Sequence, residues 1–219
     1  MPVRYERWLI ARGNVLAPSW EALISLVKKM REENWLVGKG TAFTTVESGE
    51  ANQEPVPETI ERAWLDDEGR EELRMVWSCA AAGARSPVAE GTALTLEIQR
   101  APDFVYPTRE EIGALPTECR CKEDLSFEWD EDELDPTFLR STGIYTECEA
   151  CSRTFDPAKG SATLTDPVTK KKDEVAGGAA YRFALKLESE TPSTFAPDLL
   201  AFMAKEFGRD FYEVGATSS

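Results

Sequence analysis

The chain has 219 residues, of which 42% are hydrophobic and 30% charged, as expected of one large globular domain or a domain with a small module. It contains no histidine, which excludes Ser-His-Asp and Cys-His nucleophile pairs, HExxH zinc proteases and histidine proton shuttles. Its net charge of −15 repels nucleic acid phosphates and favours a basic protein partner, with solubility as the alternative reason for the charge.

The N-terminal segment predicts a strand, a helix and a second strand. Two sets of side chains alternate over residues 4–13, as in a strand with one buried face. Ser19 is the predicted N-cap of the helix. Its apolar stripe comprises Leu23, Ile24, Leu26, Val27 and Met30. An extended run over residues 34–46 completes the unit.

The following segment is less regular. Residues 47–59 are polar and contain proline, which predicts a surface loop, and residues 57–65 predict a short helix. Residues 71–80 and 91–100 predict two paired strands, with an irregular connection over residues 81–90. Cys79 lies in the first of these strands, where we expect a buried and unreactive thiol.

The C-terminal segment repeats the plan of the N-terminal one. Alternation over residues 179–189 predicts a strand, Pro197 begins a helix that Gly208 ends, and residues 210–217 predict a strand. The residues that match at one common offset are Tyr5 with Tyr181, Trp35 with Phe211 and Thr41 with Thr217. We interpret the two segments as duplicated βαβ-like units. A chance likeness of two amphipathic helices is the alternative.

The predicted fold is therefore α+β: a core sheet with two helices, supplied by the terminal βαβ-like units. We expect this core to comprise residues 1–106 and 176–219. Residues 107–175 have little apolar periodicity and carry four of the five cysteines, so we predict that they form an insertion into the core.

The four cysteines of this insertion are Cys119, Cys121, Cys148 and Cys151. The chain has no apolar run of the ~18 residues that a membrane span needs and no signal-like N-terminus, which predicts a cytoplasmic protein with reduced thiols. Paired cysteines in that compartment favour a metal over disulfides. Disulfides and unliganded thiols remain the alternatives.

The stretch CEACSRTF resembles a knuckle of a zinc ribbon, and ECRCKEDLSF resembles one with a shorter gap. Ser152 stands where a ribbon usually has glycine, while Phe127 and Phe155 follow the two pairs as possible covers. The resemblance implies a structural Zn²⁺ with all four cysteines as ligands. Four thiolates would leave no open position for catalysis.

Two other ligands fit this segment less well. Basic residues near the cysteines form patches rather than a stripe, and six carboxylates between Glu128 and Asp135 oppose them, so nucleic acid binding is not expected. A calcium-binding loop that begins at Asp130 would need a glycine where the chain has Asp135 and a glutamate where it has Ser141. We therefore interpret the acidic run as a solvated loop.

These observations predict a non-catalytic, zinc-containing acidic binding protein that docks a basic protein partner, as immunity proteins and inhibitors do. One alternative is an adaptor or structural subunit of a larger bacterial assembly. Another is an enzyme that uses carboxylates, for which the candidate groups are Glu110-Glu111, Asp66-Asp67-Glu68 and Glu71-Glu72.

Overall fold

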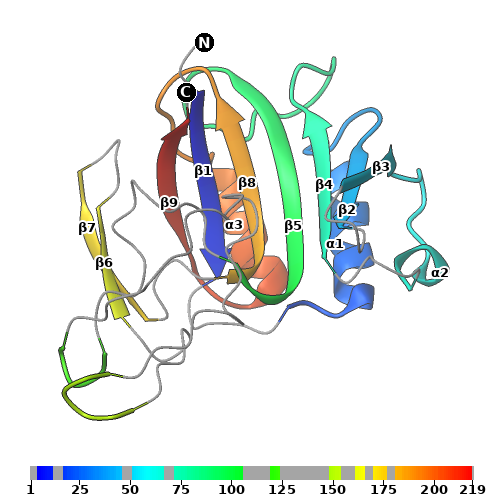
Figure 1. Ribbon diagram of the computed structural model, residues 1–219. Helices are drawn as coiled ribbons and strands as arrows, with labels where there is room; N and C mark the ends of the chain where they lie inside the picture. Colours follow the sequence, from blue (N-terminus) through cyan, green and yellow to red (C-terminus); the bar gives the residue numbers. More distant parts are fainter. Residues whose placement is uncertain are drawn as a thin grey trace.

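The computed structural model describes residues 4–11, 17–45, 51–66, 72–105, 119–123, 148–153, 161–165, 170–176 and 181–218. Its main element is a seven-stranded sheet in the order β3-β2-β4-β5-β8-β1-β9, in which every neighbouring pair is antiparallel (Figure 1). The strands are β1 (Arg4–Ala11), β2 (Thr41–Thr45), β3 (Ala51–Pro55), β4 (Leu73–Ser78), β5 (Ala93–Val105), β8 (Tyr181–Ser189) and β9 (Phe211–Ser218). With the helices packed on it, this sheet confirms the α+β class.

Two long helices cover one face of this sheet (Figure 1). Helix α1 (Trp20–Glu32) begins where the Ser19 hydroxyl accepts a hydrogen bond from the Ala22 N–H at 3.2 Å, which confirms the predicted N-cap. Helix α3 (Pro197–Phe207) ends at Gly208, whose φ of 62° is the left-handed conformation that glycine adopts without strain. Both helix ends therefore lie where the sequence places them.

The terminal units are both crossovers between parallel strands. Strand β1 is antiparallel to β8 and to β9, so α3 connects two parallel strands that flank β1. Helix α1 connects β1 to β2, which are also parallel, across β8, β5 and β4. Because the two crossovers span different numbers of strands, topology alone does not make them copies, and the duplication stays a prediction.

The main core lies between the helices and the sheet. Leu23, Leu26, Val27 and Met30 of α1 and Leu199 and Met203 of α3 are buried against alternate residues of the strands. Trp77 and Phe195 are the largest fully buried side chains. Burial of such side chains contributes about 1.5–3 kcal/mol each, so this contact fixes the helices on the sheet.

Two predictions between α1 and β4 were partly wrong. The described part of the extended run predicted over residues 34–46 forms a strand only as β2. Residues 34–40 are turns, bends and irregular backbone, because Asn34 and Gly38 have φ of 61° and 81° and the Trp35 side chain enters the core. Residues 51–55, expected in a loop, form β3 at the edge of the sheet, where Pro55 is tolerated because only one side of the strand must pair. The short helix α2 (Arg62–Leu65) and the β4–β5 pair are confirmed.

Within the predicted insertion the structure describes two cysteine turns and a hairpin. The hairpin consists of β6 (Ser161–Thr165) and β7 (Lys172–Ala176), which form a separate two-stranded sheet. The boundaries proposed for the core and the insertion stay predictions. The described helices include none with the length and apolar character needed to cross a membrane.

Candidate metal centre

Each cysteine pair lies on its own tight turn, and the two turns are closed by equivalent hydrogen bonds. In the first, the Lys122 N–H donates to the Cys119 carbonyl at 2.9 Å and the Cys119 N–H donates to the Glu123 carbonyl at 2.8 Å. In the second, the Ser152 N–H donates to the Cys148 carbonyl at 2.8 Å and the Cys148 N–H donates to the Arg153 carbonyl at 2.9 Å. The second turn therefore repeats the first with one additional residue.

The residue after the second cysteine has a left-handed backbone in both turns. Lys122 has a φ of 74° and Ser152 a φ of 51°, a region in which glycine is unstrained and other residues are uncommon. Ser152 is the position where the zinc ribbon motif usually has glycine. Ser152 therefore carries some backbone strain, and so does Lys122 in the turn with the shorter gap.

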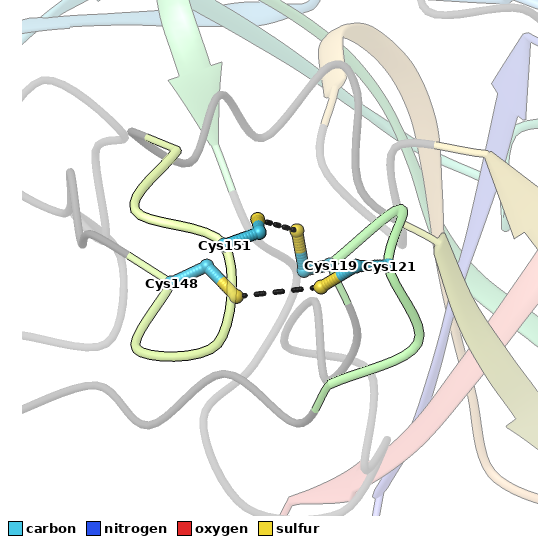
Figure 2. Close-up of side chains that lie close together, drawn as sticks. All are labelled: Cys119, Cys121, Cys148 and Cys151. Atoms are coloured by element: carbon cyan, nitrogen blue, oxygen red, sulfur yellow. Dashed lines mark hydrogen bonds between the residues drawn. The ribbon is translucent and has the colours of Figure 1, made fainter.

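The two turns face each other and bring the four sulfurs together (Figure 2). Cys119 Sγ lies 3.7 Å from Cys151 Sγ, Cys121 Sγ lies 3.5 Å from Cys148 Sγ, and all four lie within 4.8 Å of one another. A tetrahedron with Zn–S bonds of about 2.3 Å has edges of about 3.8 Å. The donor set therefore fits tetrahedral metal, although it does not identify the metal.

The sulfur cluster has a buried side and an accessible side. Cys148 is 1% exposed and Cys119 6%, whereas Cys151 is half-buried and Cys121 is exposed. Each turn contributes one buried and one accessible cysteine. The cluster is thus shielded by protein on one side and open to small reagents on the other.

Backbone N–H groups and neighbouring thiols set the acidity of the metal-free cluster. The Cys121 N–H donates to the Cys119 sulfur and lowers the pKa of Cys119 to about 7. The Glu123 N–H lowers the pKa of Cys121, but hydrogen bonds to the other three cysteines and burial together outweigh it and raise the pKa to about 12. A divalent cation bound to the sulfurs would replace the protons of the thiols.

The fifth cysteine, Cys79, lies apart from the cluster, directly after β4. It packs against the main core but is half-buried rather than fully buried as predicted. Burial raises the pKa of its thiol to about 12. At neutral pH it is therefore protonated, as expected of an unreactive cysteine.

The sequence did not identify a polar network on the sheet face away from the helices. Arg74 Nε donates to Glu97 at 2.5 Å, Gln99 donates to Glu97 at 2.7 Å, and the Tyr181 hydroxyl donates to Gln99. Strand alternation gives a signal for it, because Arg74, Glu97 and Gln99 lie between core residues of β4 and β5. Glu97 thus accepts hydrogen bonds from side chains of two strands, and we expect the network to stabilise the sheet.

The predicted acidic candidates are only partly described. Asp66 accepts from Arg62 at 2.7 Å in an exposed ion pair, and Glu72 is buried. The other carboxylates named for an enzyme, and likewise Phe127, Phe155 and the acidic run, lie outside the described residues. The interpretation as an enzyme that uses carboxylates therefore stays a prediction.

Comparison with known proteins gives no relative for this chain. No protein-family model matches it, and neither the curated proteins nor the solved structures gave a match. Function must therefore be argued from the cysteine cluster and the charge.

Proposed function

We propose that this chain is a non-catalytic binding protein of the immunity or inhibitor type, which holds one structural zinc ion and docks a basic protein partner. The observation that carries the proposal is the set of four cysteine sulfurs within 4.8 Å on two equivalent turns. Such a set saturates tetrahedral zinc and leaves no position for water or substrate.

The four cysteines would hold the ion, and zinc would supply folding free energy to a segment with little apolar periodicity. In small zinc peptides this contribution is about 10–16 kcal/mol at neutral pH. The Cys121 N–H donates to the Cys119 sulfur and favours its thiolate form. The Glu123 and Arg153 N–H groups act in the same direction on Cys121 and Cys151, although burial and neighbouring thiols raise the pKa of both in the metal-free chain. These backbone donors would help to orient the sulfurs toward the ion.

The charge of the chain supports a basic partner. The net charge is −15, and arginines neutralise only part of the described acidic surface: Arg62 pairs with Glu21 and Asp66, and Arg85 pairs with Glu33. Further exposed carboxylates belong to Glu61, Glu90, Glu190 and Asp210. An acidic field of this kind accelerates association with a basic protein and weakens as salt screens it.

The test is affinity purification with the zinc-loaded full chain as bait in an extract of the source cell, at low and at high salt. We expect one basic protein in stoichiometric amount at low salt, with recovery that falls as salt increases. Recovery of no protein at low salt, or of a partner whose binding is insensitive to salt, would contradict the docking proposal.

A further inference from the structure

The two sulfur contacts of the cluster each join one turn to the other. Cys121, which is exposed, contacts the buried Cys148, and the half-buried Cys151 contacts the buried Cys119. Every contact therefore combines a sulfur that a small reagent can reach with a sulfur that it reaches less easily.

Resting on the proposed zinc site, we propose that the cluster is a redox-convertible clamp. A two-electron oxidant of the peroxide class converts the Cys121–Cys148 and Cys119–Cys151 contacts into disulfides, and the zinc ion is released. The two turns thus stay joined, by the metal under reducing conditions and by two cross-links under oxidising ones.

The reaction follows the exposure of the sulfurs. The Cys121 thiolate attacks a peroxide oxygen, the O–O bond breaks, and hydroxide leaves, giving a sulfenic acid. The Cys148 thiolate, 3.5 Å away, then attacks the Cys121 sulfur and displaces a second hydroxide as the disulfide forms. Cys151 and Cys119 repeat these steps, so four thiolates consume two peroxide molecules and are oxidised by four electrons in all.

Geometry favours bonds between the turns over bonds within them. The two sulfur–sulfur distances of 3.5 and 3.7 Å must shorten by about 1.5 Å to reach the disulfide length of about 2.05 Å. A bond within the first turn would instead link Cys119 and Cys121, which have only one residue between them. The backbone there is already fixed by the hydrogen bonds of the Lys122 and Cys119 N–H groups. The clamp therefore predicts one connectivity of the three that four cysteines allow.

The experiment treats the zinc-loaded full chain with hydrogen peroxide in increasing equivalents and measures released zinc with a chromogenic chelator. After acid quenching and blocking of free thiols, disulfides are mapped by mass spectrometry. Cleavage after Arg120 separates Cys119 from Cys121, and cleavage after Glu149 separates Cys148 from Cys151, so trypsin with a glutamate-specific protease resolves every pair. Cys79→Ser is the matched control that removes the remaining thiol.

We expect complete zinc release at two equivalents, the two cross-turn disulfides in the map, and recovery of zinc binding after reduction. The same result is expected of the Cys79→Ser chain. A Cys148–Cys151 or Cys119–Cys121 disulfide, or zinc retained while peroxide is consumed, would overturn the clamp and leave the zinc site standing. If the purified chain binds no zinc, the proposed function fails, whereas the disulfide map of the oxidised chain still decides the connectivity.

Discussion

Cys121 Sγ lies 3.5 Å from Cys148 Sγ, although the two residues belong to different turns of the chain. This contact and its counterpart between Cys119 and Cys151 show that the turns approach each other through their sulfurs. The unequal gaps of the two cysteine pairs do not prevent this, because the same backbone hydrogen bonds close both turns. We therefore expect the backbone conformation after each cysteine pair to matter for zinc binding as much as the sulfurs do.

Replacing Ser152 tests the backbone requirement. Ser152→Gly relieves the positive φ of 51°, so we expect zinc affinity to be kept or increased. Ser152→Val places a β-branched residue in the left-handed region, and a strain of roughly 1–2 kcal/mol predicts about a 5- to 30-fold loss of zinc affinity.

Competition against a chelator of known affinity measures both variants. Glu149→Ala, in the same turn but without a left-handed backbone, is the control and should leave the affinity within about 2-fold. Equal affinities of the glycine and valine variants would show that the backbone conformation of Ser152 does not matter.

The Arg74–Glu97 pair tests the polar network on the sheet face away from the helices. Glu97 has 6% of its side chain exposed, so Glu97→Ala leaves the half-buried Arg74 without its carboxylate. Because Arg74 is itself 33% exposed, we expect a loss of about 2 kcal/mol in the free energy of unfolding, below the usual range for fully buried pairs.

Urea unfolding of the single and double alanine variants gives the coupling between Arg74 and Glu97. The exposed pair of Arg62 and Asp66 is the control, for which the coupling should be at most about 0.5 kcal/mol. A coupling for Arg74 and Glu97 no larger than that of the control would mean that the network does not stabilise the sheet.

Local patterns predicted most of the fold. The apolar stripes of α1 and α3, the Ser19 cap and the Gly208 end lie as expected because each depends on a few neighbouring residues. Strand β3 was not predicted, since its polar residues are held by backbone pairing to β2, which side-chain periodicity does not reveal. Strand order was likewise beyond the sequence, because crossovers over one or three strands have the same local pattern.

The cysteine site shows the same division. Spacing alone was enough to select Cys119, Cys121, Cys148 and Cys151, and the structure brings these four together. Their individual environments could not be predicted, because burial of Cys148 and exposure of Cys121 depend on how the turns pack. The network of Arg74 and Glu97 was missed because its residues lie on separate strands that only the register aligns.

The metal-free protein should have a defined pH dependence. The Cys121 N–H lowers the pKa of Cys119 to about 7 from the ordinary value of 9.0, so this contribution to stability is present above pH 9 and lost as the pH falls through 7. The Glu123 N–H lowers the pKa of Cys121, but hydrogen bonds to the other three cysteines and burial together raise it to about 12, so the contribution of Cys121 to stability is lost as the pH rises above 9. The metal-free turns should therefore be most stable near pH 9.

Hydrogen exchange of residues 119–123 and 148–153 in the metal-free chain measures this optimum. Cys119→Ser serves as the control, because it should remove the decrease between about pH 9 and 7 while retaining the decrease at higher pH. If protection from hydrogen exchange in the parent chain does not change between pH 9 and 7, the proposed role of the Cys121 N–H would be contradicted.

The most direct test of the zinc site is X-ray absorption at the zinc edge on the purified full chain. We predict one zinc per chain with four sulfur neighbours at about 2.3 Å and no oxygen or nitrogen neighbour. Loss of that signal in Cys148→Ser, with Cys79→Ser unchanged, would assign it to the cluster. A chain without zinc, or a zinc ion with a bound water in place of one sulfur, would contradict a saturated four-cysteine site.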